Sequence, residues 1–261
     1  MNPRMPSDVT PVASVPMRAV VTGGATNIGR AITESLLARG ARVAVGQRHL
    51  EPAQRLVARY GDRVVPIRVD VGDPADCARF IAAAAAALGG IDVLVNNAAV
   101  TGAGVIARLA EVTPEHFRRV TDVNLGGVIF CSQAAVPHLR AAGGGVIVHI
   151  SSINAVRPQA GALVYAATKA ALTSVTQSMA RELAPDGIRV VAVAPGDIMN
   201  DEERADDAAI AAKGAGADVR NQTPLGRGRT ADIGETVAFI CSPGARFVTG
   251  TTWIVDGGLL A

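Results

Sequence analysis

The segment Arg18-Ala-Val-Val-Thr-Gly-Gly-Ala-Thr-Asn-Ile-Gly29 joins a short apolar strand to a glycine turn and the start of a helix. Glycine lets a backbone turn sharply and approach a ligand closely. The first turn of the helix that follows offers free N–H groups and the positive end of the helix dipole, which together favour a phosphate. The segment therefore predicts a phosphate site, although its glycine spacing departs from G-x-G-x-x-G and is weak evidence by itself.

On both sides of the turn, short β-branched runs alternate with longer amphipathic stretches. Strands are expected at Arg18–Thr22, Arg42–Val45, Val64–Val69, Ile91–Val95, Val146–Ile150, Ile188–Val193 and Thr252–Val255. Helices are expected at Ile28–Arg39, Pro52–Tyr60, Pro74–Leu88, from Thr113 toward Leu139 with or without a break, at Tyr165–Leu183 and at Ala231–Cys241. Apolar strands separated by helices indicate a parallel sheet covered on both faces. The predicted fold class is α/β: a single-domain, Rossmann-type doubly wound parallel sheet with helices on both faces.

The bulk composition is that of one packed domain. The chain has 261 residues, of which 49% are hydrophobic and 18% charged, and it shows no internal repeat or dividing linker. We expect residues 1–16 to be a flexible N-terminal tail and residues 17–261 to form the single domain. The polar section at residues 197–220 is expected to be a substrate lid, with an ordinary pair of surface helices as the alternative.

Charge, hydropathy and cysteine content exclude several classes of protein. A net charge of +2 without a Lys/Arg cluster gives no reason to expect a nucleic acid or an acidic membrane surface as partner. No apolar run approaches the ~20 residues of a membrane span, and a secretory apolar segment is missing. Cys77, Cys131 and Cys241 are odd in number and form no CxxC pair, which favours a reducing compartment over a disulfide framework. We therefore expect a cytoplasmic protein, and we assign no metal ligands.

The end of the second predicted strand bears on which dinucleotide binds. The strand ends in Gly46-Gln47-Arg48-His49, where no carboxylate is present. A carboxylate there would bond the ribose 2′-OH of NAD, whereas an arginine would pair with the 2′-phosphate of NADP. The residues favour NADP(H), and the alternative interpretation of Arg48 is a solvated surface arginine.

Two residues four positions apart, Tyr165 and Lys169, open the long predicted helix. Residues at this spacing share a helix face, and a nearby positive charge lowers the pKa of a tyrosine from its usual ~10. Tyr165 could then act as an acid or base near neutral pH. The spacing is common, but this tyrosine is one of two in the chain and follows Ser151-Ser152 at the carboxyl edge of the sheet, where ligands bind.

Taken in order over about residues 17–261, these motifs resemble the short-chain dehydrogenase/reductase family. The glycine turn is similar to its T-G-x-x-x-G-x-G turn, with Asn27 at the middle glycine, and Asn tolerates positive φ better than other non-glycine residues. Three later segments resemble the family's adenine-contacting pair, its N-N-A-G motif and its P-G-x-I-x-T segment: Asp70-Val71, Asn96-Asn-Ala-Ala99 and Pro195-Gly-Asp-Ile-Met-Asn200. Ala99 and Asn200 replace the usual Gly and Thr.

The resemblance implies a dinucleotide site. Gln47 stands where NAD-using members carry Asp, and Arg48 where NADP-using members often carry Arg, so NADP(H) is preferred. NAD(H) stays the alternative because Thr26 lies where many NADP-using relatives have a second basic residue. For Asn96 and Asn97 a structural role is as good an interpretation as ligand contact. The expected cofactor contacts are Gly23, Thr26, Asn27, Ile28, Gly29, Gln47, Arg48, Asp70, Val71, Asn97, Ala98, Tyr165, Lys169, Pro195, Gly196, Ile198 and Asn200.

The resemblance also implies a catalytic set of Asn124, Ser152, Tyr165 and Lys169. Ser152 precedes Tyr165 by 13 residues, as in the family, and can donate to a substrate carbonyl oxygen while negative charge develops on it. Ser151 is the alternative. Asn124, in Asp122-Val-Asn-Leu, is implied to hold a water bonded to Lys169, and Lys169 to hold the ribose hydroxyls and lower the pKa of Tyr165.

The expected function is an NAD(P)(H)-dependent oxidoreductase that transfers a hydride between nicotinamide and a carbonyl compound or secondary alcohol. An NADPH-dependent ketone reductase similar to the 3-oxoacyl reductases is favoured. The alternatives are an NAD-dependent dehydrogenase of alcohols, sugars or steroids and, more remotely, a non-catalytic dinucleotide-binding sensor.

The substrate walls are expected at Ile153–Leu163, after Asn97 and in residues 197–220. Long helices that pack between subunits in many relatives imply a homotetramer, or a homodimer.

Overall fold

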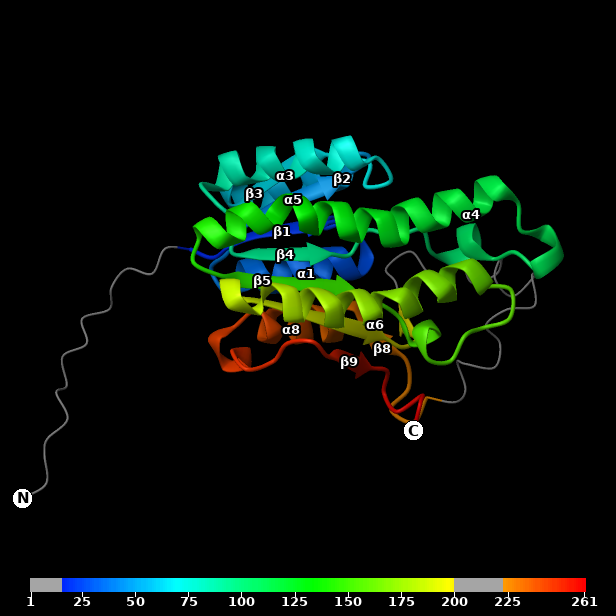
Figure 1. The fold of residues 1–261 in the computed structure, drawn as a ribbon. Coiled ribbons are helices and arrows are strands. Elements are labelled where there is room, and N and C mark those ends of the chain that lie inside the picture. Colours follow the sequence, from blue (N-terminus) through cyan, green and yellow to red (C-terminus); the bar gives the residue numbers. More distant parts are fainter. Residues whose placement is uncertain (1–15, 200–222) are drawn as a thin grey trace, which may run out of the picture.

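The central feature of the structure is a parallel sheet in the strand order β3-β2-β1-β4-β5-β6-β9 (Figure 1). The structure is a computed structural model that describes residues 16–199 and 223–261. The strands are β1 Arg18–Thr22, β2 Arg42–Gln47, β3 Val64–Arg68, β4 Val93–Asn96, β5 Gly145–Ile150, β6 Ile188–Pro195 and β9 Thr252–Val255. All neighbouring strands of this sheet pair in parallel. The predicted doubly wound α/β fold is confirmed.

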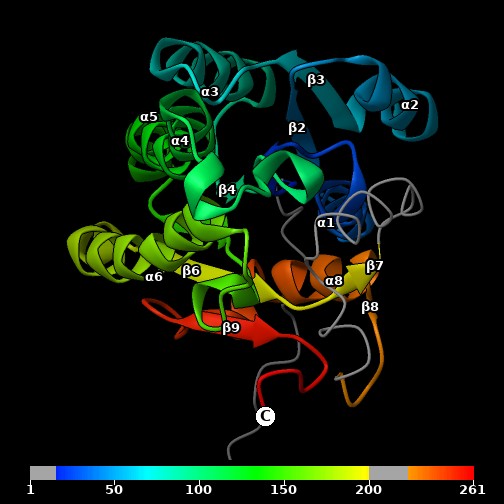
Figure 2. The same cartoon turned by 90° about the vertical axis from the view of Figure 1, so that its right-hand side faces the viewer.

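Helices cover both faces of the sheet (Figure 2). One face packs against α1 Asn27–Ala38, α2 Glu51–Tyr60 and α8 Thr230–Ile240. The other packs against α3 Pro74–Leu88, α5 Gly127–Ala141 and α6 Leu163–Leu183. Because the inner strands are buried on both sides, they are apolar at nearly every position, which is the pattern that predicted them, whereas the edge strands β3 and β9 are largely half-buried.

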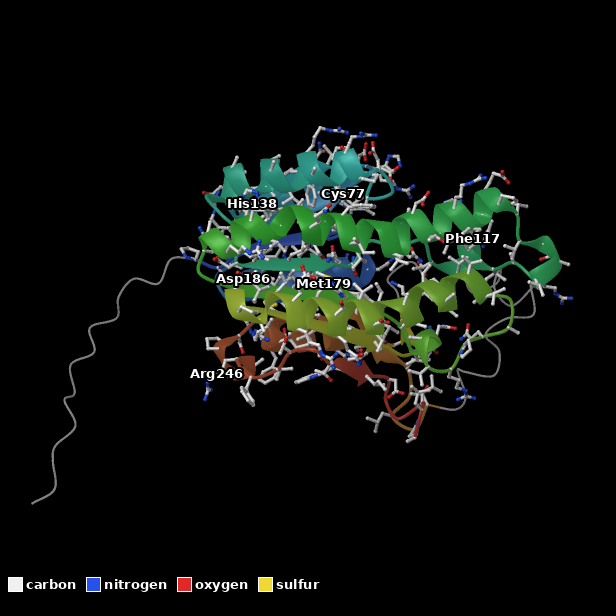
Figure 3. All side chains as sticks on the ribbon, viewed as in Figure 1. Cys77, Phe117, His138, Met179, Asp186 and Arg246 are labelled. Carbon is white, nitrogen blue, oxygen red and sulfur yellow. The ribbon has the colours of Figure 1, made fainter. Side chains whose placement is uncertain are left out.

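The strand order reverses between β1 and β4. From β1 the chain winds outward through β2 to β3, then returns to β4 and winds the other way through β5 and β6 to β9. Ligands of open α/β sheets bind where the order reverses, outside the carboxyl ends of the strands. In Figure 3, Phe117 on α4 (Pro114–Thr121) lies at the carboxyl edge, whereas His138 and Asp186 lie at the opposite edge.

The long helix expected from Thr113 toward Leu139 is interrupted. It consists of α4, a π-helical turn at Asp122–Gly126 and α5. A π-helical turn places one extra residue in the helix and often occurs at functional sites. Here it contains Asn124, whose side chain is fully buried.

The C-terminal third contains a feature outside the main sheet. A short parallel pair, β7 Ile198–Met199 with β8 Gly228–Arg229, was not expected from the sequence. Residues 1–15 of the expected tail and residues 200–220 of the expected lid, Asn200 included, lie outside the described residues. No helix in the described part of the chain is long and apolar enough to cross a membrane.

Candidate active site

A cavity of about 520 Å³ opens at the carboxyl edge of the sheet, next to the reversal of strand order. Most of the residues expected at the site line it. They are Gly23, Thr26, Asn27, Ile28, Gln47, Arg48, Asp70, Val71, Asn97, Ala98, Ser152, Tyr165, Lys169, Pro195, Gly196 and Ile198. Ser151 lines it as well, but Gly29 and Asn124 do not.

The glycine turn between β1 and α1 has the backbone shape that its sequence suggests. Gly23 has a φ of +63° and Asn27 a φ of +47°. Among the described residues, Asn27 is the one non-glycine residue with positive φ. The replacement of the family's middle glycine by Asn is therefore accommodated in the left-handed region that Asn tolerates.

Gly29 lies where the turn and the start of α1 pack closely, and its expected contact with a cofactor stays a prediction. A Cβ at this position would collide with the carbonyl oxygen of Gly23 and would lie 2.5 Å from Nδ2 of Asn97. A glycine is needed here because two backbone segments touch.

Asn97 holds the turn from the neighbouring strand end. Its Nδ2 donates to the carbonyl oxygens of Thr22 at 3.0 Å and Gly23 at 3.1 Å. Its backbone N–H and that of Ala98 both donate to Oγ1 of Thr22 at 3.0 Å. These hydrogen bonds give Asn97 a structural role. Because Asn97 also lines the cavity, contact with a ligand stays a prediction.

Gln47, the last residue of β2, has one buried polar atom without a partner. Its Nε2 has no hydrogen-bond acceptor among the described residues, and the side chain lines the cavity. Burying an unpaired donor is costly, so this amide fits a site in which a ligand oxygen accepts from it. Arg48, exposed on the same wall, adds a positive charge, and the residues present thus fit the ribose end of a dinucleotide.

Ser152, Tyr165 and Lys169 meet on one wall of the cavity. Ser152 follows β5 directly, and α6 carries Tyr165 and Lys169 in its first two turns. Oγ of Ser152 accepts from the backbone N–H of Asn154 at 3.2 Å and its hydroxyl also interacts with Tyr165. The three residues therefore present a hydroxyl, a phenol and an amine to the same space.

Lys169 is almost completely buried. It is 3% exposed, its Nζ donates to the carbonyl oxygen of Ile150 at 2.8 Å, and Nζ lies 5.7 Å from the centre of the Tyr165 ring. Desolvation lowers the pKa of Lys169 to about 8. The amine therefore still carries its charge at pH 7.

The expectation that Lys169 lowers the pKa of Tyr165 needs correction for the free protein. Desolvation of the phenol raises the pKa of Tyr165, and the hydrogen bond to Ser152 lowers it by less. The physical reason is that a phenolate loses more by leaving water here than it gains from its neighbours.

Asn124 and Ser151 are both engaged with backbone groups. Oδ1 of Asn124 accepts from the N–H of Val100 at 2.7 Å and its Nδ2 donates to the carbonyl of Val100 at 3.1 Å. Oγ of Ser151 donates to the carbonyl of Lys169 at 3.0 Å. Asn124 thus fixes the segment after β4, and the alternative of Ser151 as the catalytic serine is disfavoured because its hydroxyl is committed to α6.

Two of the segments expected to form the substrate walls contribute residues to the cavity lining. Asn154, Gln159 and Ala162 come from the loop before α6, and Val105 and Ile106 from the stretch after β4. The structure also contains an ion pair that the sequence did not predict. Nε of Arg227 lies 2.9 Å from Oδ2 of Asp197. The sequence signal was the charge of Asp197 in the family-like segment Pro195–Asn200, together with an arginine in Pro224-Leu-Gly-Arg227 nearer the C-terminus.

A family model described as enoyl-(acyl carrier protein) reductase matches residues 23–260. The cis-4-hydroxycyclohexanecarboxylate dehydrogenase of Sinomonas cyclohexanicum is 40% identical over 250 residues, which cover 93% of this chain and 96% of that protein.

Two solved structures share the fold over nearly the whole chain. A short-chain dehydrogenase from Burkholderia cenocepacia in complex with NADP has a TM-score of 0.85 and 38% identity, covering 95% of this chain and 99% of that one. A 3-ketoacyl-(acyl-carrier-protein) reductase from Brucella melitensis complexed with NADH has a TM-score of 0.85 and 31% identity, covering 95% of this chain and 100% of that one. One of these relatives thus binds NADP and the other NADH.

Proposed function

Because the chain belongs to the short-chain dehydrogenase/reductase family and is an NAD(P)-dependent oxidoreductase, we propose that it reduces a ketone with NADPH, as a 3-oxoacyl reductase does. The observation that carries the proposal is the position of Ser152, Tyr165 and Lys169 on one wall of a cavity that also contains the glycine turn. A dinucleotide held by this turn supplies the hydride when it is bound.

The three side chains have separate roles in the proposed reduction. The hydroxyl of Ser152 donates to the carbonyl oxygen as negative charge develops there. Tyr165 donates its phenolic proton to the same oxygen, and its raised pKa keeps that proton in place beforehand. The ammonium of Lys169 then favours the phenolate that remains. In oxidation of an alcohol the same residues act in reverse.

Asn124 is proposed as the fourth member of the set. Its hydrogen bonds to both backbone groups of Val100 support a role in shaping the cavity wall after β4. The water contact toward Lys169 that the family resemblance implies stays a prediction.

The preference for NADP(H) rests on the end of β2. Gln47 and Arg48 line the cavity at this point. A carboxylate in the same place would select NAD. Nε2 of Gln47 can donate to a ribose or phosphate oxygen, and Arg48 can pair with a 2′-phosphate. NAD(H) is the alternative, because a relative with the same fold binds NADH.

A dehydrogenase of a secondary alcohol is the second candidate function. The relative from Sinomonas cyclohexanicum, 40% identical, is named as a dehydrogenase of a hydroxycyclohexanecarboxylate. The first experiment is therefore a comparison of NADPH and NADH binding, followed by a panel of ketones and secondary alcohols with the tighter cofactor. Tighter binding of NADH would contradict the proposed cofactor preference.

Replacing Tyr165 by Phe tests the catalytic assignment. We expect turnover to fall by about 10²–10⁴-fold, because the proton donor is lost, while cofactor binding measured by nucleotide fluorescence is kept. Turnover close to that of the wild type would refute the role of Tyr165. Binding without turnover in the wild type, across the whole panel, would favour a dinucleotide sensor instead.

A homotetramer, or a homodimer, acting in the cytoplasm completes the proposal. Ile129 and Phe130 are exposed on α5, and Phe239, Phe247 and Ile254 are exposed on or next to α8 and β9. Apolar surface of this kind is typical of contacts between subunits. The three cysteines, free and buried, are compatible with a reducing compartment.

A further inference from the structure

Four buried polar side chains form a cluster between the sheet and the helices α5 and α6 that cover one of its faces. They are His149 on β5, Asn96 on β4, Ser132 on α5 and Thr176 on α6, each at most 3% exposed. Nδ1 of His149 lies 3.0 Å from Oγ1 of Thr176, and Nδ2 of Asn96 donates to Oγ of Ser132 at 2.9 Å. None of the four lines the cavity.

Two atoms of this cluster have no hydrogen-bond partner in the described part of the chain: Nε2 of His149 and Oδ1 of Asn96. The two residues are register partners on adjacent parallel strands. Their side chains therefore leave the sheet side by side on the same face. Leaving a buried polar group without a hydrogen bond is unfavourable, so two such atoms at neighbouring positions indicate one shared ligand.

The chemistry of the open atoms identifies the ligand as water. The four side chains include no carboxylate or thiolate, so the cluster offers little to a metal ion. A water molecule both donates and accepts, so it can bond His149 in either tautomer and Asn96 in either orientation of its amide. Internal waters of this kind commonly complete buried polar groups.

Lys169 is a buried charge that acts on this cluster. Lys169 and Thr176 are two turns apart on the same buried face of α6, and Nζ of Lys169 bonds the carbonyl of Ile150, the residue after His149. Burial and the positive charge of Lys169 lower the pKa of His149 to about 3. His149 is therefore neutral at neutral pH. Its ring can solvate the ammonium as a dipole but does not take up a second proton.

Among the described residues, Lys169 is the one charged group that acts on the pKa of His149. On β4 and α5 the cluster contains Asn96 and Ser132, which do not titrate. Cys131 precedes Ser132 on α5, and its pKa is raised by its contact with Cys77 and by burial. The cluster thus presents only neutral dipoles to one buried cation, which is the arrangement that favours the charged form of the cation.

We propose that His149 is a positioning residue for Lys169, and that with Asn96 it binds one internal water molecule which helps to solvate the lysine ammonium. The proposal rests on the proposed role of Lys169 in the reaction. The water site itself can be tested without any activity.

The first test is a crystal structure of the wild-type protein at a resolution where internal waters are visible. We expect one ordered water within hydrogen-bond distance of Nε2 of His149 and of the amide of Asn96. Direct contact of the two side chains, or an empty space between them, would overturn the water site. This outcome is independent of whether the protein reduces ketones.

The second test compares His149→Phe with His149→Gln. Phe keeps a ring but removes both nitrogens, whereas Gln keeps groups that can bond Thr176 and the water. We expect His149→Phe to move the alkaline limb of the kcat profile toward lower pH by about half a unit or more, because a less solvated Lys169 loses its proton earlier. His149→Gln should restore most of the wild-type profile.

Ile147→Val is the matched control, because Ile147 lies two residues earlier on the same strand and face and is fully buried. It lowers stability without touching the polar cluster, so its pH profile should equal that of the wild type. An unshifted profile in His149→Phe, or the same shift in Ile147→Val, would overturn the positioning role. If His149→Phe does not fold, the pH profiles of His149→Gln and Asn96→Leu are compared instead. We then expect the shift in Asn96→Leu, which removes the amide that bonds the water.

Discussion

Tyr165 and Lys169 lie within two turns of one helix, where desolvation acts on both side chains. It raises the pKa of Tyr165 and lowers that of Lys169 to about 8. In the free protein the amine therefore titrates before the phenol as pH rises. A bound cofactor that places a positive charge or hydrogen-bond donors next to the phenol would favour the phenolate, so we expect the pKa of Tyr165 to fall in the complex.

A spectrophotometric titration of the free protein tests this order. The chain has two tyrosines, and the pKa of each is raised, that of Tyr60 by burial and by Glu34. We expect no tyrosinate absorbance to develop below about pH 10, the usual pKa of the residue. In Tyr60→Phe with bound cofactor, the remaining tyrosine should ionise at lower pH. Ionisation of Tyr165 near neutral pH without cofactor would contradict the burial argument.

Gln47 is the single residue on which the cofactor preference turns. Gln47→Asp should bond the ribose 2′-OH and repel a 2′-phosphate, and so shift the ratio of NADPH to NADH affinity toward NADH by about tenfold, or roughly 1.4 kcal/mol. Titrations with both nucleotides measure it. Gln54→Asp makes the same change at an exposed position of α2 and should leave the ratio unchanged. If the ratio of NADPH to NADH affinity is the same in the two variants, Gln47 does not contact the ribose.

At the scale of elements, the junction of β1 with α1 depends on close backbone packing. Gly29 on α1 and the turn at Gly23 approach so closely that a side chain has no room, and Asn97 ties both to β4. The turn and the two strand ends therefore form one unit, and a change in its packing should affect stability and phosphate binding together.

Gly29→Ala tests this unit. The added Cβ meets backbone atoms that cannot move aside, and overpacking of this kind costs about 1–3 kcal/mol. We expect a lower midpoint of urea unfolding and weaker nucleotide binding. Gly104→Ala is the control, since a Cβ there meets only Val100, at 3.5 Å. If both variants unfold at the same urea concentration as the wild type, the packing argument fails.

At the scale of the whole molecule, the buried histidine couples stability to pH. The folded protein holds His149 neutral, with a pKa of about 3, whereas an unfolded chain protonates it near its usual ~6.5. Below about pH 6.5 the unfolded state takes up the proton and is favoured. The stability contributed by neutral His149 is thus present above pH 6.5 and is lost as pH falls toward 3.

The wild type should therefore lose about 1.4 kcal/mol of unfolding free energy per pH unit between roughly pH 6 and 4 through this residue alone. Urea unfolding at a series of pH values measures the slope. In His149→Gln the slope should be smaller by this amount, whereas in His49→Gln, at an exposed position, it should not change. Parallel slopes in wild type and His149→Gln would contradict a low pKa for His149.

The amino-acid sequence alone determined the fold class, the seven strands of the main sheet and most of the cavity lining. Hydrophobic periodicity depends on local burial, and the motifs lie at strand ends that a parallel sheet gathers at one edge. The added residue in the helix at Asn124 and the pairing of β7 with β8 were not foreseen in detail, because both depend on contacts between distant segments.

Only the tertiary structure decided how several residues act. Gly29 packs against Gly23, Asn124 binds the backbone of Val100, and Tyr165 has a raised pKa. Each result depends on which atoms of distant segments come together and how much water they exclude. A motif specifies the type and spacing of side chains, whereas their pKa values and hydrogen-bond partners follow from the packing around them.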